Sequence, residues 1–237
     1  MAGLISQMRS AVFAVTFYVG SFLIIMVTVP ALILPRGFVF GIARVWSWYH
    51  RQCCRFVLGY RIVVEGTQPK EQALYAIKHE SFFEAIDAPT FTGGPVIPFA
   101  KIELMRIPVW GRAARQYGVI GVDRDTGAQA IRQISRAARE LKPEGRDFVI
   151  FPEGTRIPHN QPGTLQAGLY AVYKILGLPL VPVAVDSGPL YQTKPKRSGT
   201  ITYRIGEVVP PGLSRDEMEA RVFAAINALN DLPETTA

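Results

Sequence analysis

The stretch Lys78–Asp87, KHESFFEAID, places one histidine among three carboxylates. His79 follows the short apolar run Ala73–Ile77, which is typical of a strand. The carboxyl end of a strand is where open α/β sheets usually place their ligands. An imidazole that is oriented by a carboxylate can take a proton from a hydroxyl group, so this stretch predicts a general base at His79.

The carboxylate that orients this base is predicted to be Glu84. Ser81 and Glu84 fit the S-x-x-E capping box, with Ser81 as the N-cap of a helix and Glu84 at its third position. Such a glutamate points back toward the residues just before the helix, where His79 lies. A helix cap alone also explains Glu84. Asp87, a further turn into the helix, and Glu80, close to the histidine along the chain, stay as alternatives.

A second polar stretch, Phe151–Arg156 with the sequence FPEGTR, follows the predicted strand Asp147–Phe151. It combines a glycine turn, a hydroxyl donor and a guanidinium, which together can bind a phosphate. The candidate binding residues in this block are Glu153, Gly154, Thr155 and Arg156. A polar turn with a surface arginine gives the same pattern.

Two further cations, Lys101 and Arg124, each lie beside the end of a predicted strand. These strands are Pro95–Ala100 and Gly118–Arg124. Both cations can therefore face one cleft and add positive charge to it. Solvated surface cations are the alternative interpretation.

The elements that must position these residues begin after Gly59. Runs rich in β-branched residues alternate with helical stretches such as Thr126–Leu141, whose apolar residues recur along one face. This alternation predicts one α/β domain over residues 59–232, with a mainly parallel central sheet flanked by helices. Further strands are expected at Tyr60–Gly66, Leu180–Val185 and Thr200–Val209, and further helices at Leu165–Leu176 and Arg215–Leu229.

The N-terminal segment has a different character. Ala11–Pro35 holds no charged residue in 25 positions, and about twenty apolar residues suffice for a helix to cross a bilayer. Pro30 and Pro35 interrupt the run, so a single crossing and a hairpin within one leaflet both stay open. Arginines and aromatic residues are interleaved in Arg36–Arg55, as in a helix that lies in the membrane interface. Residues 1–58 are therefore predicted to form membrane-anchoring helices.

The charge balance favours an anionic partner. Lys and Arg outnumber Asp and Glu by 26 to 19, a formal net charge of +7. Because the N-terminus is so apolar, we expect that partner to be membrane lipid and not nucleic acid. Four arginines follow the apolar run and one precedes it, so the positive-inside rule predicts a cell-membrane protein with its α/β domain on the cytoplasmic face. The two adjacent cysteines lack metal-ligand spacing, so no metal site is expected.

The order of these motifs resembles the glycerolipid acyltransferase family, which includes the lysophosphatidic acid acyltransferases. The matching features are a histidine and a carboxylate with four residues between them, then K-x-E-L…P…G…G…VDR, then FPEGTR and finally VPVAV. The match covers Ala73 to Val185.

The resemblance implies an O-acyltransferase. It would move a fatty acyl group from a thioester, either acyl-CoA or acyl-carrier protein, to the free hydroxyl of 1-acyl-glycerol-3-phosphate, giving phosphatidic acid in phospholipid biosynthesis. No cofactor beyond that co-substrate is implied. His79 and Glu84 would form the catalytic pair, and Pro182 in VPVAV would lie near the acyl or acceptor site. The acceptor would be bound by Lys101, Arg124, Glu153, Gly154, Thr155 and Arg156, with Arg156 on the phosphate.

Two residues depart from the family pattern. Glu84 stands where aspartate is most frequent, and Lys78, where asparagine is common, could favour an anionic substrate. Two other functions stay open: transfer to another lysolipid such as a lyso-ornithine lipid, and a non-catalytic membrane protein that binds lipid in the same basic cleft. A hydrolase is not favoured because the sequence has no G-x-S-x-G motif.

Overall fold

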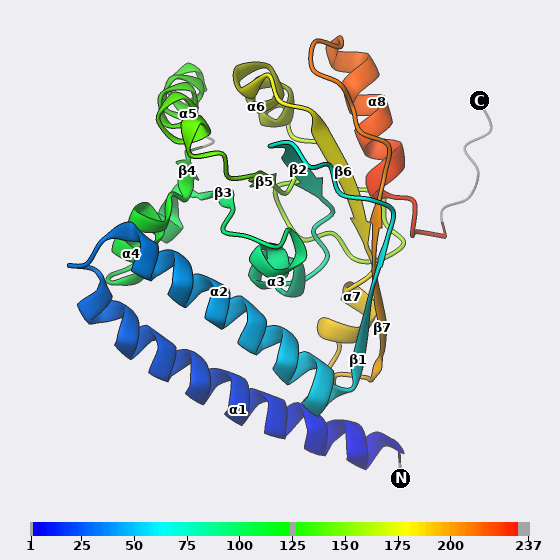
Figure 1. The fold of residues 1–237 in the computed structure, drawn as a ribbon. Coiled ribbons are helices and arrows are strands. Elements are labelled where there is room, and N and C mark those ends of the chain that lie inside the picture. The colour runs from blue at the N-terminus through cyan, green and yellow to red at the C-terminus, as the bar shows by residue number, and fades with distance from the viewer. Residues whose placement is uncertain (1, 124–126, 232–237) are drawn as a thin grey trace.

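A helical hairpin opens the chain in the computed structural model, which describes residues 2–123 and 127–231. Helix α1 (Ala2–Ala31) and helix α2 (Arg36–Cys53) run antiparallel and are joined by a tight turn (Figure 1). A short π-helical segment, η1 (Cys54–Leu58), connects α2 to the first strand. The hairpin therefore lies side by side with the rest of the chain instead of extending away from it.

Seven strands form one sheet in the order β1-β7-β6-β2-β5-β3-β4. Their bounds are β1 (Tyr60–Glu65), β2 (Leu74–Ile77), β3 (Ile97–Lys101), β4 (Ile120–Val122), β5 (Phe148–Ile150), β6 (Leu180–Val185) and β7 (Gly199–Ile205). All neighbouring strands pair in parallel except β6 and β7. The predicted α/β fold with a mainly parallel sheet is confirmed.

Helices cover both faces of this sheet (Figure 1). Helices α5, α6 and α8 lie on one face, whereas α3 lies on the other, with α2 packed over α3 and α1 outermost. The bounds are α3 (Phe83–Phe91), η2 (Ile102–Arg106), α4 (Trp110–Tyr117), α5 (Ala128–Leu141), η4 (Lys142–Glu144), α6 (Gly168–Leu176), α7 (Gly188–Tyr191) and α8 (Arg215–Ile226).

Strand β2 shows why its sequence reads as a continuous apolar run. Leu74 and Ala76 belong to the core beneath α5, α6 and α8, whereas Tyr75 and Ile77 belong to the core beneath α3. Successive side chains of a strand point to opposite faces, so a strand that is covered on both sides must be apolar throughout. Because β2 lies in the middle of the sheet, between β6 and β5, the segment that follows it begins at a well-defined place at the edge of the sheet.

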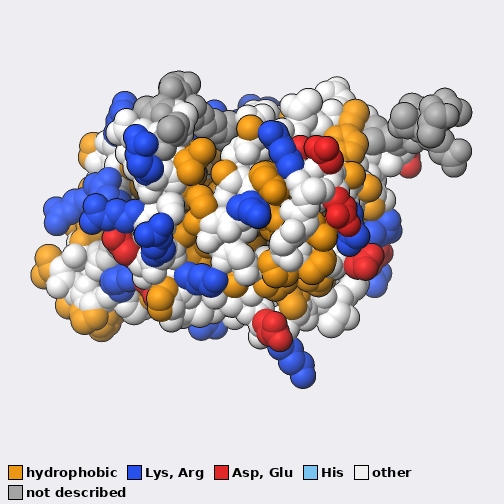
Figure 2. All heavy atoms as spheres, turned by 90° about the horizontal axis from the view of Figure 1, so that it is seen from above, with side chains coloured by type: hydrophobic (Ala, Val, Ile, Leu, Met, Phe, Trp, Pro, Cys, Tyr) orange, Lys and Arg blue, Asp and Glu red, His pale blue; other side chains and the backbone are white. Residues whose placement is uncertain are grey.

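The surface differs sharply between the two sides of the molecule. On the side of α5, α6 and α8, many Lys and Arg side chains are exposed, and they gather toward the α5 end (Figure 2). Helix α1, in contrast, has one charged side chain in 30 residues, Arg9. By length and composition, its part Gly3–Ala31 could cross a membrane. More exposed large apolar side chains lie on α1 than on any other element.

Candidate active site

The candidate site lies at the carboxyl ends of β2 and β5. These strands are parallel neighbours, so the segments that follow them lie side by side. The backbone N–H of His79, after β2, donates to Oε2 of Glu153, after β5, at 3.1 Å. The N–H of Ile157 donates to the carbonyl of His79 at 2.8 Å. The fold therefore joins the histidine stretch to the FPEGTR block at His79 itself.

His79 contacts Glu84 as predicted. Nδ1 of His79 lies 3.0 Å from Oε1 of Glu84, whose side chain is fully buried. The imidazole stacks on the Phe151 ring with 4.3 Å between centroids, and 16% of its side chain is exposed. No described residue hydrogen-bonds to Nε2 of His79, so this nitrogen is free to accept a proton from a substrate hydroxyl.

Four further contacts hold the Glu84 carboxylate. Oε1 accepts the backbone N–H groups of Glu80 and Ser81, each at 2.6 Å. Oε2 accepts the hydroxyl of Ser81 at 3.0 Å and that of Ser187 at 2.6 Å. A buried charge without partners would be costly, and these donors remove that cost while they fix the carboxylate next to the imidazole.

The predicted capping box is only partly formed. Helix α3 begins at Phe83, so Phe82 and not Ser81 occupies the N-cap position. Glu84 accepts the Ser81 N–H as a capping-box glutamate does, whereas the Ser81 hydroxyl accepts the N–H of Phe83 at 3.0 Å. The predicted N-cap is therefore wrong by one residue. The half of the motif that turns Glu84 toward His79 is kept.

Asp87, one alternative partner for the histidine, is used elsewhere. Its two oxygens accept from Nε and Nη2 of Arg51 on α2 at 2.7 and 2.5 Å, and the Tyr203 hydroxyl donates to Oδ2 at 3.0 Å. Burial raises the pKa of Asp87, while Arg51 and Tyr203 oppose that rise. Asp87 therefore fastens α3 to the hairpin.

Glu80, the other alternative, belongs to a second histidine–carboxylate pair. Its Oε1 lies 2.9 Å from Nδ1 of His159, and its Oε2 accepts the N–H of Gly188 at 2.9 Å. Burial is the largest influence on the Glu80 carboxyl and raises its pKa. This pair connects the histidine stretch to the segment after FPEGTR and to the start of α7.

Lys78 is buried and does not face an anionic substrate, which corrects one expectation. Its Nζ lies 3.0 Å from Oε1 of Glu153 and 2.9 Å from Oδ1 of Asn227, which follows α8. With Oε1 on Lys78 and Oε2 on the His79 N–H, both oxygens of Glu153 are engaged inside the protein. Glu153 thus ties together the segments that follow β2, β5 and α8.

The end of the FPEGTR block, residues 154–156, forms a turn at the surface. Gly154 has a φ of 67°, a left-handed conformation that glycine adopts at low cost. Thr155 and Arg156 are exposed. The guanidinium carbon of Arg156 lies 4.2 Å from the centre of the Phe82 ring, at the start of α3. No carboxylate in the described part of the chain pairs with Arg156, so its charge can bind an anion.

The predicted cation Lys101 is the exposed last residue of β3, the strand next to β5. In register it pairs with Val122, the last residue of β4. Arg124 lies outside the described residues. Pro182 is buried in β6, opposite Ala76 of β2. Within residues 2–123 and 127–231, no three His, Cys, Asp or Glu side chains gather as metal ligands would.

Sequence reasoning did not find Ser187 or the Glu80–His159 pair. Ser187 is 103 positions from Glu84, and His159 is 79 positions from Glu80. A serine after a strand and a histidine in a loop carry no local signal. Only the sheet order brings them to this site.

Comparisons with known proteins agree with this architecture. The acyltransferase family model matches residues 61–186. The 1-acyl-sn-glycerol-3-phosphate acyltransferase of Pseudomonas aeruginosa is 30% identical over 186 residues, 77% of this chain and 70% of that protein. The human 1-acyl-sn-glycerol-3-phosphate acyltransferase alpha is 27% identical over 173 residues, 70% of this chain and 61% of that protein.

A solved structure shares the fold. The crystal structure of the 1-acyl-sn-glycerophosphate (LPA) acyltransferase PlsC from Thermotoga maritima has a TM-score of 0.71, covering 94% of this chain and 95% of that chain at 21% identity. The family model spans more than half of the present chain, and the bacterial relative aligns over most of both sequences. This protein therefore belongs to the acyltransferase family and is an O-acyltransferase.

Proposed function

We propose that this chain transfers a fatty acyl group from a thioester to the free hydroxyl of 1-acyl-sn-glycerol 3-phosphate, which gives phosphatidic acid for phospholipid biosynthesis. The observation that carries the proposal is the His79–Glu84 contact at the end of β2, joined through the FPEGTR block to the exposed Arg156. The relatives named for this acceptor support the choice of lysolipid.

His79 acts as the general base. Its Nε2 takes the proton of the acceptor hydroxyl while that oxygen attacks the thioester carbonyl carbon. The tetrahedral intermediate collapses, the carbon–sulfur bond breaks, and the leaving thiolate takes the proton back from the imidazolium. The products are an ester and a free thiol. Glu84 holds Nδ1–H and stabilises the positive charge on the ring during the transfer.

The acceptor phosphate is bound by Arg156, with Gly154 and Thr155 shaping the turn beside it. Lys101, at the end of β3, adds positive charge, and we propose the same role for Arg124. Glu153 contributes as a positioning residue, because its carboxylate is occupied by Lys78 and by the His79 N–H.

The acyl donor is acyl-CoA or an acylated acyl-carrier protein. We propose no further cofactor, since the thioester is already activated and the imidazole supplies the base.

We further propose that residues 1–58 anchor the protein to the cytoplasmic face of the cell membrane, while residues 59–232 carry out the transfer. Helix α2 packs on α3 and α1 packs along α2, so α1 lies along the body of the molecule (Figure 1). An α1 that crossed the bilayer would draw α2 and α3 into the hydrocarbon with it. A hairpin that lies within one leaflet leaves the sheet in water.

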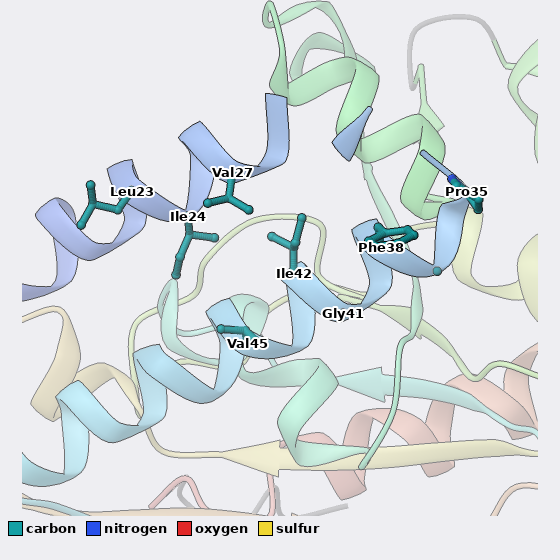
Figure 3. Close-up of a pocket in the computed structure, with 9 residues that line it drawn as sticks. Leu23, Ile24, Val27, Pro35, Phe38, Gly41, Ile42 and Val45 are labelled. Atoms are coloured by element: carbon teal, nitrogen blue, oxygen red, sulfur yellow. The ribbon is translucent and has the colours of Figure 1, made fainter. Parts of the chain in front are cut away.

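A groove between the two helices fits this position. It has a volume of about 670 Å³ and is lined by residues of α1, of α2 and of the turn between them (Figure 3). Its lining consists of apolar residues and glycines: Leu23, Ile24, Val27, Pro35, Gly37, Phe38, Gly41, Ile42 and Val45. Such a lining suits the acyl-chain layer of a membrane.

The test is a donor and acceptor panel. Full-length protein is incubated with acyl-CoA or acylated carrier protein, and with lysophosphatidic acid or a lyso-ornithine lipid, while free thiol and lipid products are measured. We expect thiol release coupled to phosphatidic acid formation. His79→Ala should lower the rate by at least about 10²-fold, because a general base typically contributes about 10² to 10⁴-fold. Full activity of that variant would refute the mechanism, and exclusive use of the amino lipid would refute the acceptor.

A further inference from the structure

A serine from a distant part of the chain holds the carboxylate of the proposed catalytic pair. Ser187 lies between β6 and α7, and its Oγ donates to Oε2 of Glu84 at 2.6 Å. Both side chains are fully buried. None of the matched motifs includes Ser187, yet its bond to Glu84 is shorter than the 3.0 Å contact between Glu84 and His79.

The two oxygens of Glu84 have different tasks. Oε1 faces Nδ1 of His79, whereas Oε2 is held only by the hydroxyls of Ser81 and Ser187 among the described residues. The last torsion of a glutamate side chain is broad and roughly two-fold, so hydrogen bonds must select its orientation. Glutamate also has one more rotatable bond than the aspartate that is frequent in the family. The hydroxyls on Oε2 therefore act together with the backbone N–H groups of Glu80 and Ser81, which hold Oε1, to fix how the carboxylate is turned.

Ser187 is the better placed of the two hydroxyls. The Ser81 hydroxyl lies farther from Oε2, also accepts the N–H of Phe83, and lies 2.7 Å from the Ser187 hydroxyl. Ser187 is fixed by α7, because its carbonyl accepts the N–H of Tyr191 at 2.8 Å. The next residue, Gly188, donates its N–H to Glu80 at 2.9 Å, and a Cβ at Gly188 would lie 3.0 Å from that carboxylate.

We propose that Ser187 is a positioning residue for the acyl transfer. It holds the Glu84 carboxylate turned so that Oε1 meets Nδ1 of His79 and keeps the proton on that nitrogen. Nε2 then stays unprotonated and ready to act as the base. This role rests on the function proposed above, in which His79 is the general base.

The first measurement is steady-state kinetics of Ser187→Ala. Because the hydroxyl contacts the carboxylate and not the substrate, kcat should fall by about 10- to 100-fold, a part of what a general base contributes, with KM values unchanged within about twofold. Ser47→Ala is the matched control. Ser47 is also fully buried, and its Oγ lies 2.6 Å from Oγ1 of Thr90, so this variant loses an equivalent hydroxyl contact between α2 and α3. Its kcat should stay near the wild-type value.

The second measurement needs no turnover. The ¹⁵N chemical shifts of the His79 ring report which nitrogen carries the proton, and the signal is assigned by its loss in His79→Gln. We expect the Nδ1–H form to dominate in the wild type and in Ser47→Ala, and a mixture of both tautomers in Ser187→Ala.

The outcomes separate the two proposals. An unchanged tautomer in Ser187→Ala, or a fall in kcat that Ser47→Ala reproduces, would overturn the role of Ser187. A wild-type protein that acylates no lysolipid would overturn the proposed function, while the ring shifts would still decide whether Ser187 orients the pair.

Discussion

Glu84 stands where the family most often has the shorter aspartate, and the groups around it are placed to contact the longer glutamate side chain. The side chain starts from the first turn of α3 and reaches back to His79, where its carboxylate meets backbone N–H groups and two serine hydroxyls. This arrangement explains how the chain departs from the more frequent aspartate and still has a paired histidine. The longer side chain brings Oε1 to Nδ1 of His79 while Oε2 accepts the hydroxyls of Ser81 and Ser187.

Shortening this residue should therefore impair the enzyme. From the same backbone position, the shorter side chain of Glu84→Asp cannot contact both His79 and the serine hydroxyls. The orientation of His79 is then lost. We expect kcat to fall by about 10- to 100-fold with little change in KM. Glu84→Gln keeps the length of the side chain but removes its charge, and kcat should fall at least as far as in Glu84→Asp. Wild-type kcat in Glu84→Asp would show that the observed contact geometry is not needed.

His50 is a buried histidine of a different kind. Its Nε2 lies 2.9 Å from the Tyr191 hydroxyl, and its Nδ1 has no hydrogen-bond partner in the described structure. Burial, assisted by Lys196 and Arg51, lowers the pKa of His50 to about 3. The ring is therefore neutral in the folded protein and becomes charged only after unfolding at mildly acidic pH.

This neutral ring should make the fold sensitive to acid. An unfolded histidine titrates near pH 6.5, so between about pH 6.5 and 3 the unfolded chain binds the additional proton. The free energy of unfolding then falls as the pH drops, by at most about 1.4 kcal/mol per unit from this residue. We expect Tm to fall less between pH 7.5 and pH 5 in His50→Gln than in the wild type. Equal falls in both proteins would contradict the assignment.

At the scale of elements, the Lys78–Glu153 ion pair connects three segments. Lys78 follows β2, Glu153 follows β5, and Asn227 follows α8. Both charged side chains are almost fully buried. A buried pair is not by itself a strong source of stability, but removing one partner leaves the other charge unpaired in the interior.

Lys78→Met should therefore be strongly destabilising. Loss of one partner of a buried pair typically costs about 3–5 kcal/mol, because the remaining carboxylate is uncompensated. The double variant Lys78→Met with Glu153→Gln should recover part of that loss, as measured by denaturant unfolding. Arg215→Met is the control, since its exposed pair with Glu219 on α8 should contribute less than about 1 kcal/mol. Equal losses in the free energy of unfolding for Lys78→Met and Arg215→Met would contradict this view of the buried pair.

At the scale of the whole molecule, the hairpin and the sheet face different surroundings. The outer surface of α1 is apolar, whereas the opposite side of the molecule is rich in Lys and Arg (Figure 2). Between the two sides, α3 rests on the sheet and is bound to α2 by Asp87 and Arg51. A membrane contact through the hairpin would therefore hold the carboxyl ends of β2 and β5 at a constant distance from the lipid surface.

A charge on the exposed face of α1 should weaken membrane binding. Val15 on α1 and Val64 on β1 are both exposed valines, at 66% and 45%. Because a lysine in the hydrocarbon costs about 2.5–3.5 kcal/mol, Val15→Lys should lower partitioning into anionic vesicles by at least about tenfold. Val64→Lys should leave partitioning unchanged. Equal binding of both variants in a vesicle flotation assay would contradict the proposed anchoring through α1.

The structure contains the predicted strands and helices wherever an element is long enough for its pattern of apolar residues to be recognised. The strands β2 and β6 and the helices α5, α6 and α8 match the predicted ranges to within a few residues. Helix α4 has eight residues and α7 has four, which is too short for a helical pattern of apolar residues to stand out. The N-cap of α3 is Phe82 and not Ser81, whose hydroxyl contacts both the Glu84 carboxylate and the N–H of Phe83.

The α/β alternation, the apolar N-terminus and the contact of His79 with Glu84 could be predicted from the sequence, because each depends on residues that are close along the chain. The pairing of Lys78 with Glu153 and of Ser187 with Glu84 could not be predicted in this way, since these pairs are 75 and 103 positions apart along the chain. The sheet order β6-β2-β5 creates both contacts, because it gathers three strand ends that the linear sequence keeps apart. Local patterns can suggest a base and its partner, but the supports of that pair come from neighbours in space.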